Sequence, residues 1–151
     1  QTTLQQIFIS RAFTAYQLTQ LLFQRVNQAL EDYRAKLVVI SDITTLYLDR
    51  DMPKTEAQVV FNKLTQHLTQ LASEKNLAVL ATHIPHHPTK LSIFLQAALH
   101  GRADTLLKLE EDNRILRLML ERHPNLKPRT VQLPLNSLGN SVTLEDFMEE
   151  A

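Results

Sequence analysis

The sequence predicts an α/β fold in which helices flank a mostly parallel central sheet, with antiparallel strands toward the C-terminus. Two uninterrupted apolar runs, residues 37–40 and 77–81, have the length and composition of strands that are buried on both faces, as in parallel sheets. Long amphipathic stretches precede and separate these runs, which is the alternation of βαβ units. After Gly101 the pattern changes to short strand-like runs, which favours antiparallel pairs.

The first half of the chain is predicted to contain a short strand and two long helices around the first apolar run. Residues 6–10 are an apolar run that indicates a strand. Thr14 is a suitable N-cap, and from there to about Ala35 apolar residues recur at the i, i+3, i+4 and i+7 positions of a helix. Charged residues and a proline over 49–53 indicate a loop, and a second amphipathic helix is expected over 55–75.

The second half is predicted to begin with an irregular segment and a helix. Two prolines restrict the residues that precede them within 83–88, so this segment is expected to be irregular. Residues 90–100 have helical spacing, with Gly101 as the residue that stops the helix. Residues 111–113 indicate a hairpin turn. The remaining predicted elements are three strands, a loop and a terminal helix, over residues 104–109, 115–121, 130–133, 134–141 and 143–146.

Length and composition indicate one soluble domain over residues 1–151, with 44% hydrophobic and 21% charged residues. No stretch approaches 18 apolar residues and no signal peptide is visible, so the expected location is cytoplasmic and no membrane contact is expected. The chain has no cysteine, which excludes disulfides, thiolate zinc sites and cysteine nucleophiles.

Glycine content and net charge restrict the functions further. The chain has only 2 glycines, so it cannot contain a glycine-rich loop that cradles phosphates. Its 16 basic and 16 acidic residues give a net charge of zero, which disfavours tight binding to nucleic acid without a partner.

Polar side chains follow both buried strands, where ligands bind in open α/β sheets. Ser41 and Asp42 follow the first strand, and Thr82 and His83 follow the second. Asp42 is a candidate magnesium ligand, and the Thr82–His83 pair could face a phosphate. A carboxylate in this position also commonly caps the following loop, and a threonine there commonly forms a turn, so both interpretations stay open.

Two other clusters are candidates for binding. His83, His86 and His87 lie within five residues, with His100 downstream, and imidazoles at such spacing can hold zinc or nickel; a solvated histidine-rich loop is the alternative. Arg122, Lys127 and Arg129 are possible nucleic-acid contacts, and a solvated basic loop is the alternative there. The spacing of serine, histidine and aspartate shows no nucleophile elbow, which disfavours hydrolase chemistry.

The order of several short motifs resembles the RadA branch of the RecA-like recombinases. Residues 9–13 (Ile-Ser-Arg-Ala-Phe) and the helix after them look like that family's Arg-Ala-Phe strand and helix. Residues 37–47 look like its Walker B strand with the downstream Thr-x-Leu-Tyr, and residues 55–82 look like the next helix and the phosphate-sensing strand. The match covers roughly residues 7–121.

The sequence departs from the family pattern at the positions that carry its chemistry. The family's Walker B strand ends in aspartate and then serine, whereas Ser41 precedes Asp42 here, and a shift of one residue turns a strand side chain to the other face. The family's sensor strand ends Thr-Asn-Gln, whereas Thr82 is followed by His83 and Ile84. The P-loop segment and catalytic glutamate of the family would lie before Gln1.

The resemblance implies a RecA-like domain of a P-loop NTPase type without its nucleotide-binding N-terminal part, from a family of DNA recombination and repair. It implies ATP and Mg²⁺ as family cofactors, while the chain alone is expected to be inactive.

The leading hypothesis is a non-hydrolysing binding and assembly module, with a protein partner or a second copy and at most weak DNA binding. One alternative is a fragment of an active ATP-dependent recombinase-like ATPase whose P-loop half lies upstream. The other is a metal-dependent protein that uses His83, His86 and His87.

Overall fold

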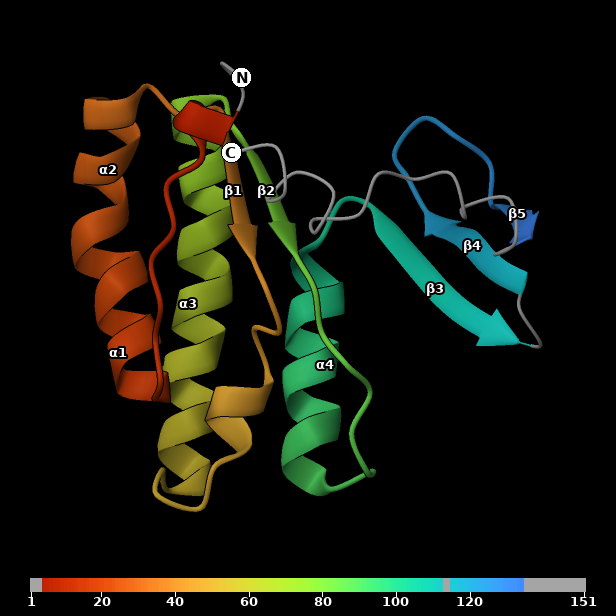
Figure 1. The fold of residues 1–151 in the computed structure, drawn as a ribbon. Helices are drawn as coiled ribbons and strands as arrows, with labels where there is room; N and C mark the ends of the chain where they lie inside the picture. The colour runs from red at the N-terminus through yellow and green to blue at the C-terminus, as the bar shows by residue number, and fades with distance from the viewer. Residues whose placement is uncertain (1–3, 113–114, 135–151) are drawn as a thin grey trace, which may run out of the picture. The chain divides into compact units, whose positions relative to one another are not determined.

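The computed structural model describes residues 4–112 and 115–134 (Figure 1). The chain divides into two compact units, Gln1–Arg102 and Ala103–Ala151, and each is described by itself. Whether the chain acts as the single domain expected from its length stays a prediction.

The N-terminal unit contains one continuous helical segment, two strands and two further helices. In chain order its elements are a short 3₁₀ turn η1 (Leu4–Gln6), helix α1 (Ala15–Gln20), a π-helical turn η2 (Leu21–Arg25), helix α2 (Val26–Tyr33), strand β1 (Leu37–Ile40), a 3₁₀ turn η3 (Thr45–Leu48), helix α3 (Lys54–Lys75), strand β2 (Ala78–Ala81) and helix α4 (Lys90–Arg102).

Capping residues define where the helical segments begin and end. Thr14 caps α1 as predicted, because its hydroxyl accepts a hydrogen bond from the backbone N–H of Gln17 at 3.2 Å. Arg34 and Asn76 end α2 and α3 in the left-handed conformation, with φ of 50° and 48°. The same two ends are joined by an ion pair between Lys75 and Glu31 at 2.8 Å, which lowers the pKa of the Glu31 carboxyl.

Strands β1 and β2 form a two-stranded parallel sheet, with Leu37 opposite Ala78 and Ile40 opposite Ala81. The face that carries Val38, Ile40 and Val79 packs against the helices, and the opposite face leaves Val39 59% exposed. A parallel strand normally has helices on both faces. Here a helical layer covers only one face among the described residues.

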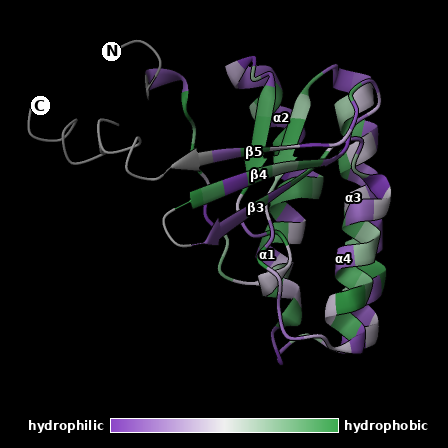
Figure 2. Cartoon of the chain, turned by 90° about the vertical axis from the view of Figure 1, so that its right-hand side faces the viewer, coloured by the Kyte–Doolittle hydropathy of each residue, from purple (hydrophilic) through white to green (hydrophobic). Residues whose placement is uncertain are grey.

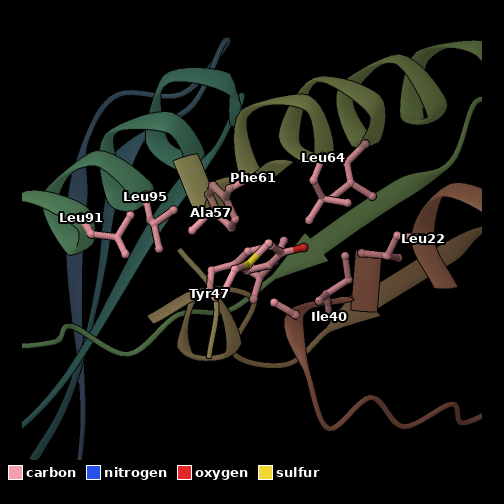
Figure 3. Packing of buried hydrophobic residues seen from close by; sticks show 12 residues of the cluster. Leu22, Ile40, Tyr47, Ala57, Phe61, Leu64, Leu91 and Leu95 are labelled. Carbon is pink, nitrogen blue, oxygen red and sulfur yellow. The ribbon is translucent and has the colours of Figure 1, made fainter. Parts of the chain in front are cut away.

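The core lies between this sheet face and the helices (Figure 3). Tyr47 from η3 and Phe61 from α3 are fully buried at its centre, with their rings edge to face and 5.0 Å between centroids. The Tyr47 hydroxyl lies 2.7 Å from the Thr19 hydroxyl, which also donates to the carbonyl of Ala15. Both hydrophobic and hydrophilic residues occur along the length of α3 and α4 (Figure 2), as expected for helices with one face on a core.

Among the described residues, no helix is both long and apolar enough to cross a membrane.

The C-terminal unit is a three-stranded antiparallel sheet in the order β3–β4–β5. Its strands are β3 (Leu106–Asp112), β4 (Ile115–Arg122) and β5 (Arg129–Pro134). The predicted antiparallel strands are therefore confirmed. An ion pair between Lys108 and Glu110 on β3 raises the pKa of the lysine and lowers that of the carboxyl.

The prediction of a strand over residues 6–10 is wrong. Residues 7–10 have no regular structure, and no neighbouring strand pairs with them among the described residues. Ile9 is 86% exposed, while the ring of Phe8 stacks on that of Tyr33 with 3.6 Å between centroids. An apolar run supplies side chains for a strand, but without a partner its backbone hydrogen bonds cannot form.

Three further predictions need correction. The apolar runs at 37–40 and 77–81 are strands, but they are not buried on both faces. The parallel sheet has only two described strands, and the antiparallel strands form a sheet of their own and do not extend it. Gly101 lies inside the last turn of α4 and does not stop it, since a glycine ends a helix only where the backbone turns left-handed.

Some predicted elements fall partly or wholly outside the described residues. Residues 111–112 belong to β3, where they pair with β4, and the predicted turn position at 113 lies outside the described residues. The loop predicted over 135–141 and the terminal helix predicted from Thr143 also lie outside them.

Candidate functional site

The carboxyl ends of β1 and β2 lie side by side, because the two strands are parallel and in register. The backbone continues this pairing past the strands: Thr82 donates to the carbonyl of Ile40 at 3.0 Å, and Ile43 donates to the carbonyl of Thr82 at 3.0 Å. The backbone N–H of Asp42 donates to the Thr82 hydroxyl oxygen at 3.0 Å. Two of the residues singled out in the sequence, Asp42 and Thr82, are thus in direct contact.

The Asp42 carboxylate points toward the residues that follow it in the chain, Thr44 and Thr45. One oxygen accepts hydrogen bonds from the backbone N–H of Thr45 at 3.3 Å and from the Thr44 hydroxyl at 3.4 Å. The other oxygen accepts one from the Thr45 hydroxyl. Asp42 has φ of 49°, a left-handed conformation that aspartate adopts more readily than most residues. Its side chain therefore closes the turn over residues 42–45 that leads into η3, whose own N-cap position is Thr44.

His86 extends this network on one side. Its Nε2 lies 2.9 Å from the Thr45 hydroxyl, so Asp42, Thr45 and His86 form a connected chain of polar groups. The side chain of His86 also lines a shallow pocket of about 60 Å³. The other residues that line the pocket are Thr44, Leu48, His83, Ile84, Pro85, Pro88, Ser92, Ile93 and Gln96.

The side chains of His83 and His86 contact different partners, and His87 is held through its backbone. His83 faces His100 on α4, with 3.2 Å between their Nε2 atoms, whereas His86 faces Thr45. The carbonyl of His87 accepts a hydrogen bond from the Ser92 hydroxyl at 3.0 Å. Within residues 4–112 and 115–134, no group of three or more histidine, aspartate or glutamate side chains is placed to hold a metal ion.

Ser41 and Ile84 are two of the positions at which the sequence departs from the resembled family. Ser41 is exposed at the end of β1, one residue before the capping aspartate. Ile84 is 62% exposed and lines the pocket with an apolar side chain.

The basic cluster belongs to the C-terminal unit, around the connection between β4 and β5. Arg122 ends β4 and Arg129 begins β5, while Lys127 lies in the connection, and all three are exposed. The guanidinium of Arg122 donates to the backbone carbonyl of Ala103, so this residue has a structural contact within its own unit.

Two residues of the site were not recognised as partners from the sequence. Thr45 joins Asp42 to His86, and a hydroxyl three residues after an aspartate is a signal for such a capped turn. His100 pairs with His83 across 17 residues, and no local spacing rule indicates that contact.

Comparison with known proteins shows similarity at the level of fold. No family model matches the chain, and no curated protein matches it in sequence. Among solved structures, the ATPase domain of a helicase matches with a TM-score of 0.53 and 15% identity over 84% of this chain. The KaiC-like protein PH0186 from Pyrococcus horikoshii OT3 matches with a TM-score of 0.50 and 16% identity over 82% of this chain.

The chain spans about half the length of these structures, 50% of the first and 51% of the second. Both are RecA-like ATPase domains, and neither distinguishes the RadA branch. The small parallel sheet followed by an antiparallel sheet is therefore similar in fold to RecA-like ATPase domains.

Proposed function

We propose that this chain is a RecA-like module, related to DNA recombination and repair proteins, that binds and assembles with other protein and does not hydrolyse ATP. The observation that carries the proposal is the orientation of Asp42. Both oxygens of its carboxylate accept hydrogen bonds from Thr44 and Thr45, which hold them against η3. A carboxylate committed to a turn is poorly placed to serve a metal–phosphate complex as well.

The residues around Asp42 support the same proposal. The Thr82 hydroxyl, at the position where the resemblance implies a phosphate sensor, accepts a hydrogen bond from the backbone N–H of Asp42 and so acts within the fold. The next position but one is Ile84, whose side chain has no polar group for a phosphate oxygen. The chain also has too few glycines to form a phosphate-cradling loop of its own.

The uncovered face of the parallel sheet supports the assembly part of the proposal. Leu37, Val39 and Leu80 are each about half exposed there, although such a face is normally covered in α/β proteins. Exposed apolar side chains that lie together on one face are typical of protein–protein contact surfaces. A protein partner or a second copy of the chain would cover them.

A titration of the chain with magnesium and ATP tests the proposal. We expect no heat of binding by isothermal calorimetry at millimolar nucleotide, in the wild-type chain and in Asp42→Asn alike. The asparagine keeps an oxygen that can accept the hydrogen bond from the Thr45 N–H, and it removes the negative charge that a magnesium ion needs. Micromolar, magnesium-dependent binding that is lost in Asp42→Asn would contradict the proposal.

A second function is favoured by one observation, the contact between Asp42 and Thr82 at the carboxyl edge of the sheet. The resemblance implies a magnesium and phosphate site at this edge, where these two residues meet. The chain would then be half of an active recombinase-like ATPase, with the P-loop half encoded upstream. A Gly-Lys-Thr or Gly-Lys-Ser motif in the gene upstream of Gln1, together with ATP turnover by the longer protein, would support this alternative.

A further inference from the structure

The pair formed by His83 and His100 lies apart from the Asp42 network. His83 lies in the segment that follows β2, and His100 is in the last turn of α4. Their Nε2 atoms are 3.2 Å apart, and their rings are inclined by 62° with 5.3 Å between centroids. Both side chains are half-buried, so the two nitrogens face each other in a partly desolvated position.

Two facing imidazole nitrogens can share either a proton or a metal ion. A neutral imidazole has one N–H and one nitrogen with a lone pair, so one ring of such a pair donates and the other accepts. A transition-metal ion replaces that shared proton, and the ring that carried the proton keeps it on Nδ1 instead. Both nitrogens then become ligands without any change in the charge of either ring.

The two nitrogens are close enough to bind one zinc ion. With Zn–N bonds of about 2.05 Å, a separation of 3.2 Å corresponds to an N–Zn–N angle of about 103°, which is near tetrahedral. Zinc, which prefers tetrahedral sites, therefore fits the observed geometry.

We propose that His83 and His100 form a binding site for a single Zn²⁺ ion, with water or an external ligand in the remaining positions. Two protein ligands are what the described residues supply, since no third histidine, aspartate or glutamate completes a metal-holding group among them. Catalytic zinc sites have three protein ligands and one open position, whereas these two rings would leave two positions to water or an external ligand. His83 also lines the shallow pocket, which gives an ion a route from solvent.

The position of the site gives binding a measurable consequence. The ion would join the segment after β2 to the end of α4, two parts of the N-terminal unit that are 17 residues apart in sequence. Because the unfolded chain does not hold the two rings together, binding stabilises the folded state. Zinc at about tenfold excess over its dissociation constant should raise the Tm by about 3–6 °C.

The experiment is a zinc titration of the full chain after treatment with EDTA. We expect one Zn²⁺ per chain by isothermal calorimetry, and a loss of affinity of about tenfold or more in His83→Gln and in His100→Gln. His86→Gln is the matched control, since its ring contacts the Thr45 hydroxyl, and it should keep wild-type affinity within about twofold. His87→Gln is a second control, with the same expectation. Mg²⁺, which prefers oxygen ligands, should produce no change in Tm.

Nitrogen-15 NMR of the wild-type chain tests the site without any variant. Zinc should shift the Nε2 resonances of two of the six histidines, and His83→Gln and His100→Gln should identify them by the loss of one resonance each. Three results would overturn the proposal: no zinc binding at about 1 mM metal, wild-type affinity in His100→Gln, or lost affinity in His86→Gln. The last result would place the metal at the loop histidines. None of these results involves nucleotide, so they leave the proposed function untouched.

Discussion

The backbone N–H of Asp42 donates a hydrogen bond to the hydroxyl oxygen of Thr82 at 3.0 Å, across 40 residues of sequence. This bond joins the segments that follow β1 and β2 at the edge where an α/β sheet places its ligands. It also holds Asp42 in its left-handed conformation, from which the carboxylate reaches Thr45. The Asp42–Thr82 contact therefore gives a structural role to two residues that the sequence also indicates as candidate ligands of magnesium and phosphate.

Replacing Thr82 by valine should destabilise the chain, because valine keeps the shape and removes the acceptor for the Asp42 N–H. We expect a loss of about 1 kcal/mol in the free energy of unfolding, measured by urea denaturation. Thr82→Ser retains the hydroxyl and is the matched control, with a smaller loss. Equal stabilities for Thr82→Val and the wild type would show that the bond contributes nothing.

Tyr47 should make the chain less stable at alkaline pH. Burial raises the pKa of the Tyr47 hydroxyl above its ordinary value of 10.0, so the folded chain keeps a proton that the unfolded chain releases. Stability is then fully present below pH 10 and falls as pH rises toward the folded pKa.

The Tyr47→Phe variant isolates this effect. It should be less stable at neutral pH by about 1 kcal/mol, because the contact with the Thr19 hydroxyl is lost. Its stability should also decline less steeply than that of the wild type above about pH 10. Urea denaturation at several pH values makes the measurement, and parallel curves for the two proteins would rule out a role for Tyr47 in the decline.

Val39 should be required for assembly, since it is the most exposed of the apolar side chains on the uncovered sheet face. We expect Val39→Lys to shift the chain to lower mass in size-exclusion chromatography with light scattering, at unchanged folded content by circular dichroism. Val59→Lys, on an exposed position of α3, is the matched control and should leave the mass unchanged. A monomeric wild type, with no partner that protects this face, would contradict the assembly proposal.

Binding to single-stranded DNA should be weak and should depend strongly on salt, because the net charge of the chain is zero. The triple variant Arg122→Ala, Lys127→Ala and Arg129→Ala should lose whatever binding exists. Fluorescence anisotropy at several salt concentrations measures both effects. Nanomolar affinity that resists salt, or unchanged affinity in the triple variant, would argue against this basic cluster as the contact.

The parts of the fold that could be predicted are those in which a side-chain pattern and a local cap agree. The helical spacing of apolar residues over 55–75 predicts that Phe61 and Leu64 are core residues, and the hydroxyl of Thr14 predicts where α1 begins. Both predictions are confirmed. The meeting of Asp42 and Thr82 could also be anticipated, because parallel strands bring their carboxyl ends to one edge.

The remainder depends on partners that a local pattern does not specify. Residues 7–10 have the side chains of a strand, but pairing is a property of two segments, and the described residues provide no second one. His83 and His100 meet because α4 has the length and direction to return its last turn to the end of β2, which spacing rules do not encode. The sequence leaves the role of Asp42 open between metal ligand and cap. The hydrogen bonds that its two oxygens accept support the cap, and no local pattern specifies them.

Steady-state hydrolysis of ATP in the presence of Mg²⁺ tests the central claim most directly, namely that Asp42 caps a turn and does not serve phosphate chemistry. The account predicts no turnover above that of a heat-denatured sample, in the wild-type chain and in Asp42→Asn. Asp42→Asn should also keep near wild-type stability, because asparagine caps almost as well as aspartate. Turnover by the wild-type chain that disappears in a folded Asp42→Asn variant would contradict the account.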